Sequence, residues 1–348
     1  MSLPLKSTAA FMLLALAAPT LADEIVLIPG TTVKQAAGNR VRGTVQSEAL
    51  TEVVVKLGAN TINVPTDQII SIRYDGQPAS LALAESNESG GQLAKAAELY
   101  KKAAVEADGK PFIVQTAQYK HAEVTADLAM ADPSKASEAV TLLEAFVKTN
   151  PASRHTGPAL DTLARLQLQK GDFPQAEKTI ASLSAIPTGA DRAAILRAKI
   201  LARKGDHAKA VAELDRLIKA APAGSLRQTE ARLAKAESLA ALKQFGAAET
   251  DLRSVIKTLP AEDVAGQSSA YNTLGDSLRA AGRPKDALLA YLHTDLLFSK
   301  DKEQHPRALS AISQLWRELK RDDRADDVFA RLKQEYPQSP WLTAKANP

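Results

Sequence analysis

The sequence has 348 residues, a length that allows two or three domains with a buried core. Its 45% hydrophobic and 24% charged residues fit a soluble globular protein. The net charge of +4, or +3 without Lys6, excludes a broad surface for polyanions, so we expect no nucleic-acid partner. No cysteine is present, which excludes disulfides, thiolate metal sites and a lipid-carrying cysteine.

Residues 1–22 have the pattern of a secretory signal peptide. Lys6 supplies positive charge, Ala9 to Ala18 form an apolar run, and small residues end at Ala22. We therefore expect cleavage after Ala22 and export, to a bacterial periplasm or beyond the cell. No later stretch approaches the roughly 18 uninterrupted apolar residues of a membrane helix, so we expect the mature protein to be soluble.

Residues 23–76 alternate between apolar and polar side chains. β-Branched runs at 40–45, 52–57 and 67–74 are separated by turn residues, with a hairpin turn at 58–60. This pattern predicts a small antiparallel, barrel-like β-domain. It resembles the SH3-like or Sm-like barrels at the start of some bacterial repeat proteins. Because Tyr74 is its one candidate for base stacking, a docking or capping module is favoured over an RNA-binding one.

Residues 77–348 repeat a helical pattern about seven times. Each repeat has an alanine near the start of its second helix, and these anchor alanines are 34 to 43 residues apart. The anchors are Ala96, Ala139, Ala176, Ala210, Ala248, Ala287 and Ala325. A glycine-containing turn precedes most anchors and a proline follows most second helices. The second repeat is the weakest, because its turn at 131–135 has no glycine.

The spacing and residue types of these repeats resemble the tetratricopeptide repeat. The match is closest in residues 268–299, where Leu274, Gly275 and Leu278 take first-helix positions and Ala287 and Tyr291 second-helix positions. The resemblance implies a mainly α fold, in which antiparallel helix pairs stack into a right-handed solenoid. It also implies a concave groove, lined mainly by the first helix of each pair, that binds a protein or peptide.

The sequence contains no motif that carries catalysis or holds a cofactor. Its five histidines are scattered singly, and it lacks paired-histidine, phosphate-loop, dinucleotide and nucleophile-elbow motifs. His207, in a repeat turn, and His305, before a proline, are interpreted as solvated side chains. We therefore expect a protein that is not an enzyme and binds no metal or cofactor.

Counting back from each turn selects the residues that would line the groove. The selected partner-binding residues are Arg165, Gln169, Arg192, Lys199, Arg203, Asn272, Arg279 and Arg317. The same count selects Asp161, Glu230 and Glu237, so the lining is mixed with a basic centre. An acidic segment of the partner would pair with Arg192, Lys199 and Arg203. Reversing these three charges is expected to weaken binding without lowering the melting temperature. The alternative interpretation of the selected residues is a solvated helix face that binds no partner.

Three functions remain open at this point. The sequence favours a periplasmic or cell-envelope scaffold that binds another protein. An accessory protein that binds or acts on peptidoglycan or polysaccharide would need aromatic platforms, and only 4% of the residues are aromatic. A structural spacer would bind no selective ligand and would associate through its ends. The partner's identity and the oligomeric state are not indicated.

Overall fold

The structure, a computed structural model, describes residues 22–222, 224–337 and 339–342. The expected signal peptide therefore lies outside the described residues, except for Ala22. The chain divides into two compact units. The β unit ends at Gln77 and lacks Glu48–Thr51. The helical unit consists of Glu48–Thr51 and the chain from Pro78 onward. Among the described helices, none combines the length and apolar character that crossing a membrane requires.

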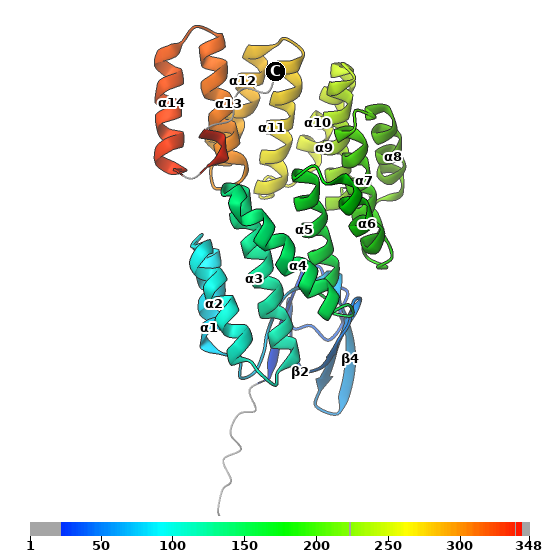
Figure 1. The fold of residues 1–348 in the computed structure, drawn as a ribbon. Coiled ribbons are helices and arrows are strands. Elements are labelled where there is room, and N and C mark those ends of the chain that lie inside the picture. Colours follow the sequence, from blue (N-terminus) through cyan, green and yellow to red (C-terminus); the bar gives the residue numbers. More distant parts are fainter. Residues whose placement is uncertain (1–21, 223, 338, 343–348) are drawn as a thin grey trace, which may run out of the picture. The chain divides into compact units, whose positions relative to one another are not determined.

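The β unit is an antiparallel sheet of five strands in the order β4-β3-β2-β1-β5 (Figure 1). The strands are β1 (Asp23–Leu27), β2 (Arg40–Glu48), β3 (Glu52–Leu57), β4 (Asn60–Pro65) and β5 (Ile69–Arg73). In strand β1, which lies between β2 and β5, Ile25 lies opposite Val41 on one side and Ile72 on the other, and all three are buried. The expected hairpin joins β3 to β4, with Leu57 paired to Asn60. The apolar side chains of the alternating sequence pattern are thus mainly the buried ones, and the polar side chains are mainly the exposed ones.

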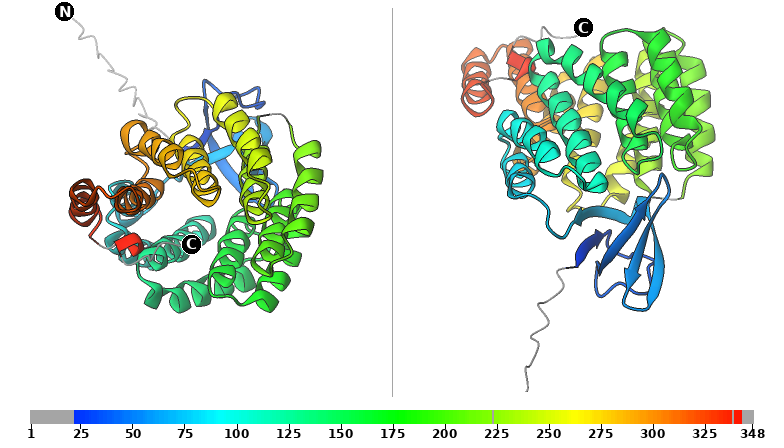
Figure 2. Two further views of the ribbon diagram at one scale, coloured as in Figure 1. Left: turned by 90° about the horizontal axis from the view of Figure 1, so that it is seen from above. Right: turned by 60° about the horizontal axis from the view of Figure 1, so that its bottom comes forward.

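The helical unit confirms the predicted solenoid fold, and its described residues form seven helix pairs. The helices are α1 (Ala79–Ser89), α2 (Leu93–Glu106), α3 (Pro111–Ala131), α4 (Ala136–Thr149), α5 (Thr156–Gln169), α6 (Phe173–Ser184), α7 (Ala190–Arg203), α8 (His207–Ala220), α9 (Leu226–Ala241), α10 (Phe245–Thr258), α11 (Val264–Ala280), α12 (Pro284–Leu297), α13 (Gln304–Glu318) and α14 (Asp322–Glu335). Within this unit each pair packs on the next in chain order (Figure 2).

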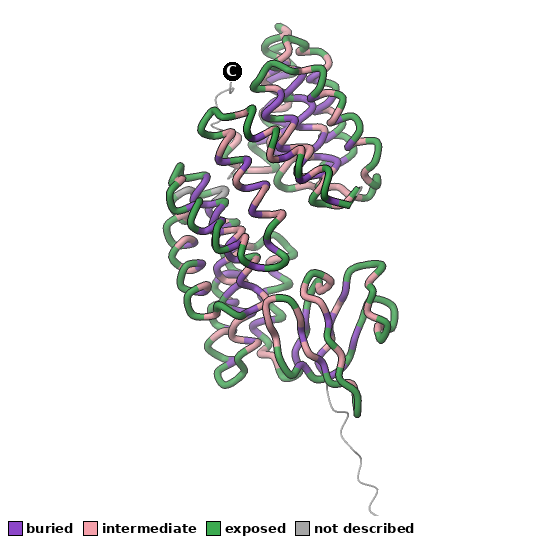
Figure 3. Tube along the Cα trace, turned by 90° about the vertical axis from the view of Figure 1, so that its right-hand side faces the viewer, coloured by how far each residue is buried: buried purple, intermediate pink, exposed green. Residues whose placement is uncertain are grey.

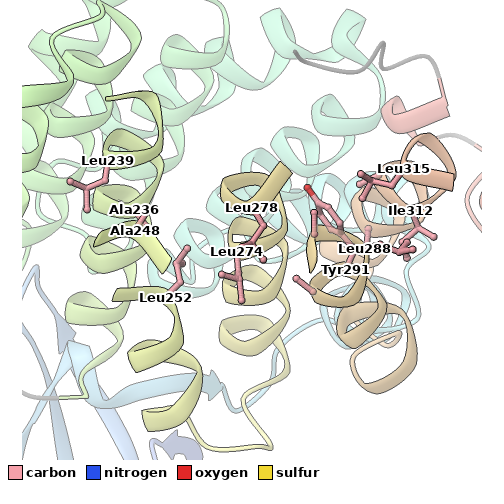
Figure 4. Packing of buried hydrophobic residues seen from close by; sticks show 14 residues of the cluster. Ala236, Leu239, Ala248, Leu252, Leu274, Leu278, Leu288, Tyr291, Ile312 and Leu315 are labelled. Atoms are coloured by element: carbon pink, nitrogen blue, oxygen red, sulfur yellow. The ribbon is translucent and has the colours of Figure 1, made fainter. Parts of the chain in front are cut away.

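The seven anchor alanines are all completely buried, as the repeat pattern predicts. Their small side chains let the two helices of a pair approach closely. Figure 3 shows buried residues along the helices of this unit, and they form several clusters. One cluster joins α9 to α13 through Leu239, Leu252, Leu274, Tyr291 and Leu315 (Figure 4). Because this core spans several pairs, each pair depends on its neighbours for stability.

A left-handed residue reverses the chain five positions before six of the seven anchors. Glycine takes this position in four pairs, at 91, 171, 205 and 282. Lys243 and Lys320 take it in two others, with φ of 60° and 58°. A lysine in this conformation costs about 1 kcal/mol relative to glycine, so stacking of the neighbouring pairs determines the turn there. The second pair instead has a 3-10 helix, Pro133–Lys135, where the sequence lacks the glycine signal.

His305 is buried, so its interpretation as a solvated side chain is wrong. Its exposure is 1%, with Nε2 at 2.9 Å from Asp295 Oδ1 and Nδ1 at 2.7 Å from the Tyr336 hydroxyl. Arg331 of α14 donates a second hydrogen bond to the same Asp295 oxygen, at 2.9 Å. This network joins α12, α13 and the end of α14, and it explains a buried histidine without a catalytic role. His207 is half-buried and is the first residue of α8, not a turn residue.

Candidate binding site on the inner face

The first helices of successive pairs contact one another directly, from α3 through α5, α7, α9 and α11 to α13. Five of these helices carry a polar residue eleven positions before the anchor alanine. These residues are Arg165, Lys199, Glu237, Asp276 and Gln314. Equal distance from a buried anchor places them on equivalent faces of their helices. We call this surface, together with Asp127, Gln169, Arg203, Arg279 and Arg307, the inner face.

The inner face curves toward itself around Glu237 of α9. The charges that act on this carboxylate come from Lys199 and Arg203 on α7, Asp276 on α11 and Arg307 on α13. Helix α13 is two pairs away from α9, so a flat row of helices would keep Arg307 distant. Loss of water raises the pKa of Glu237 although the side chain is exposed, and the neighbouring cations only partly oppose this rise.

Arg192, which the sequence predicted to contact a partner, is paired with carboxylates within the chain. Its Nε donates to Asp161 Oδ1 of α5 at 2.6 Å, its Nη2 donates to Asp161 Oδ2 at 3.1 Å, and Nη1 pairs with Glu230 of α9. Burial alone would lower the pKa of Arg192, but these two carboxylates outweigh it and raise the pKa. Arg192 therefore joins three successive helix pairs.

Three further predicted residues also make contacts within the chain. Asn272 is fully buried and donates from Nδ2 to the carbonyl oxygen of Gln304 at 2.9 Å. Arg279 donates to Gln314 Oε1 at 2.9 Å and pairs with Glu318. Arg317 pairs with Asp326 at 2.9 Å. These contacts fasten α13 to α11 and α14, so the three residues are not freely available to a partner.

The other four predicted residues are exposed and lie together on α5 and α7. Arg165, Gln169, Lys199 and Arg203 make no hydrogen bond or ion pair with any described residue through their side chains. Arg165 and Gln169 are four residues apart on α5, as Lys199 and Arg203 are on α7, so each pair shares one helix face. The structure thus brings together half of the predicted set as three unpaired cations and an amide.

Asp127 of α3 is a residue of the inner face that the sequence did not reveal. It is exposed and has no hydrogen bond or ion pair among the described residues, yet its pKa rises to about 6. Loss of water is the main cause, Glu123 adds to the rise, and Arg165 opposes it. The sequence prediction selected no residue in this repeat, whose turn lacks glycine; Asp127 lies twelve positions before the anchor Ala139, one more than in the other repeats.

Replacing Asp127 with asparagine is expected to stabilise the protein at pH 7.5 but not at pH 4. A folded pKa above the ordinary value means that ionisation destabilises the folded state as pH rises from 3.8 through about 6. Exposure reduces the effect to about 1 kcal/mol. Melting curves of both forms at the two pH values check this. Asp108→Asn, in an exposed loop, is the control; an equal shift at both pH values would contradict the assignment.

Comparison with known proteins supports the repeat fold. The family model described as tetratricopeptide repeat matches residues 162–225 and 272–340. These two segments are tetratricopeptide repeats. The first contains Arg165, Gln169, Lys199 and Arg203, and the second contains Asn272, Arg279 and Arg317. No curated protein matches the chain. Among the described residues, no cluster of histidine, aspartate or glutamate is arranged to hold a metal ion.

Solved structures with a similar fold match about three quarters of the chain. A tetratricopeptide repeat protein from Parabacteroides merdae matches at 15% identity and TM-score 0.50, covering 76% of this chain and 96% of its own. The quorum sensor NprR from B. thuringiensis matches at 13% identity and TM-score 0.53, covering 73% and 74%. A Rap protein matches at 12% identity and TM-score 0.51, covering 76% and 77%. At these identities the likeness concerns the tetratricopeptide fold alone.

Proposed function

We propose that this protein is an exported, non-enzymatic scaffold of the periplasm or cell envelope that binds a segment of another protein on its inner face. The observation that carries the proposal is the contrast among the cations of its tetratricopeptide repeats. Arg192, Arg279 and Arg307 are all paired with carboxylates. Arg165, Lys199 and Arg203 have no such partner among the described residues.

Three clustered cations on a curved protein surface favour an anionic ligand. A carboxylate that contacts several cations at once gains more than it would from one isolated exposed cation. The similar Rap protein was solved in complex with Competence and Sporulation Factor, so a solenoid of this fold can hold a ligand. Export is proposed from the signal-peptide pattern of residues 1–22.

The two alternatives have less support in the contacts of the chain. A sugar-binding site needs an open aromatic ring, but Tyr271 stacks on His293 at 4.5 Å, and cations lie over Trp316 at 5.3 Å and over Phe329 at 4.6 Å. A spacer that joins end to end needs an apolar final helix. Helix α14 instead exposes charged side chains along most of its length and buries only Ala325 and Leu332.

Reversal of Lys199 and Arg203 to glutamate is expected to abolish partner capture and to lower the melting temperature only slightly, because both side chains are exposed and neither is paired, although both act on Glu237. The measurement is crosslinking and capture from a cell-envelope extract, with wild type and variant compared by mass spectrometry. Lys178→Glu with Lys257→Glu is the control, since it makes the same charge change at exposed positions of α6 and α10. Equal capture by the two double variants would contradict binding on the inner face.

A further inference from the structure

The unpaired charges of the inner face follow a definite order along the solenoid. Asp127 lies on α3, Arg165 on α5, Lys199 and Arg203 on α7, and Glu237 on α9. The sign of charge is therefore negative, positive, positive and negative across four successive helix pairs. None of these side chains makes a hydrogen bond or ion pair with a described residue.

Neutralised networks bound this block on both sides. On the side of α3, Lys120 pairs with Glu88 at 2.9 Å and with Glu123 at 2.7 Å. On the side of α11, Arg307 pairs with Asp276, which also accepts the hydroxyl of Tyr291. The charges of the block differ from these networks in having no partner among the described residues, although Arg192, on one of the same helices, is paired with Asp161 and Glu230. An external ligand is the natural source of the block's missing partners.

The two carboxylates of the block lack a counterion for the same physical reason. Near Asp127, the effect of the cations Lys120 and Arg165 on its charge is opposed by Glu88 and Glu123. Near Glu237, the effect of the cations Lys199, Arg203 and Arg307 is opposed by Asp276. At both sites loss of water outweighs the cations, and the pKa of each carboxyl is raised. A cation placed beside either carboxylate would stabilise its charged form.

We propose that the bound segment has an acidic centre, which contacts Arg165, Lys199 and Arg203, and a basic residue on each side, which contacts Asp127 and Glu237. This inference rests on the proposed function, because it specifies the ligand of the same surface. The flanking carboxylates exclude a purely acidic ligand as the best fit, since its ends would be repelled by them.

The spacing of the helices sets the spacing of the charges in the ligand. Packed helices lie about 8–10 Å apart, and an extended chain advances about 3.3 Å per residue. Each helix pair therefore corresponds to about three residues of the ligand. Three steps separate α3 from α9, so the two basic residues should lie about nine residues apart, with the acidic residues between them.

Three synthetic peptides of about 15 residues, built on the same glycine-serine frame, test this pattern. The first has glutamates at its centre and neutral ends, and the second adds a lysine on each side, about nine residues apart. The third inverts all charges of the second. Fluorescence anisotropy with the purified protein at moderate salt measures their affinities. The second peptide is expected to bind about tenfold more tightly than the first, and the third most weakly.

Conservative variants separate this inference from the proposed function. Asp127→Asn with Glu237→Gln is expected to remove the gain from the lysines and to keep the binding of the neutral-ended peptide. Lys199→Glu with Arg203→Glu is expected to abolish the binding of both. If the lysines of the second peptide add no affinity, or if they add the same affinity with the Asp127→Asn, Glu237→Gln variant, the proposed charge pattern is wrong. Recognition of the acidic centre still stands in that case. If neither acidic-centred peptide binds, both the pattern and acidic recognition are overturned.

Discussion

Arg192→Ala is expected to destabilise the protein by about 2 kcal/mol, the largest loss among substitutions of the predicted partner-binding cations. Removal of the guanidinium leaves Asp161 and Glu230, on the two flanking pairs, without their shared partner. Because each pair is stabilised by its neighbours, the loss weakens two interfaces between pairs. Arg192→Lys should restore only part of the stability, since an ammonium does not match the two parallel bonds to Asp161.

The matched control is Lys199→Ala on the same helix, which removes an exposed cation without a partner and should change stability by less than about 0.5 kcal/mol. Thermal unfolding of the three variants and wild type checks the prediction. Equal melting temperatures for Arg192→Ala and Lys199→Ala would show that the ion pairs contribute nothing. The sequence-based expectation was that reversing Arg192, Lys199 and Arg203 leaves the melting temperature unchanged; because Arg192 is paired with Asp161 and Glu230, we now expect the triple reversal to lower it.

Gly275→Ala is expected to destabilise the protein by about 3 kcal/mol. A Cβ atom at this position of α11 would lie 2.6 Å from the ring of Tyr291 on α12. That ring is buried, at 1% exposure, and its hydroxyl bonds to Asp276, so it cannot move aside without disturbing the inner face. The added methyl group must therefore push the two helices of the sixth pair apart.

Gly246→Ala in α10 provides the control, because no atom lies within 4 Å of the position that its Cβ would take. It should be neutral or stabilise by about 0.5 kcal/mol, as alanine favours the helix. Chemical denaturation of both variants gives the comparison. Combining Gly275→Ala with Tyr291→Leu should cost less than the sum of the single changes, since the smaller side chain relieves the crowding. Strict additivity would contradict the proposed contact.

The repeat architecture could be predicted because its signals are local. A buried alanine near the start of each second helix, a turn before it and a proline after it fall within about twenty residues. The turns at Lys243 and Lys320 were harder to find, because lysine does not favour the left-handed conformation that the fold imposes there. The burial of His305 was missed since its partners, Asp295, Arg331 and Tyr336, lie on other helices or beyond α14.

The binding face could be predicted only as a set of helix positions. Counting back from the turn placed Arg165, Lys199 and Arg203 correctly on exposed faces, but it could not separate free residues from paired ones. Pairing depends on the offset between helices of neighbouring repeats. A signal did exist: Arg192 and Glu230 each lie eighteen residues before their anchors, so opposite charges occupy equivalent positions in successive repeats. Such a match indicates an internal ion pair.

The central claim, that a protein partner lies on the inner face, is tested most directly by photocrosslinking in the producing cell. A photoreactive amino acid at Gln169, exposed between the unpaired cations, is compared with one at Lys178, exposed on α6 of the same pair. We predict a discrete adduct from position 169 that disappears when Lys199 and Arg203 are reversed, and none from position 178. Equal adducts from both positions, unaffected by the reversal, would contradict the claim.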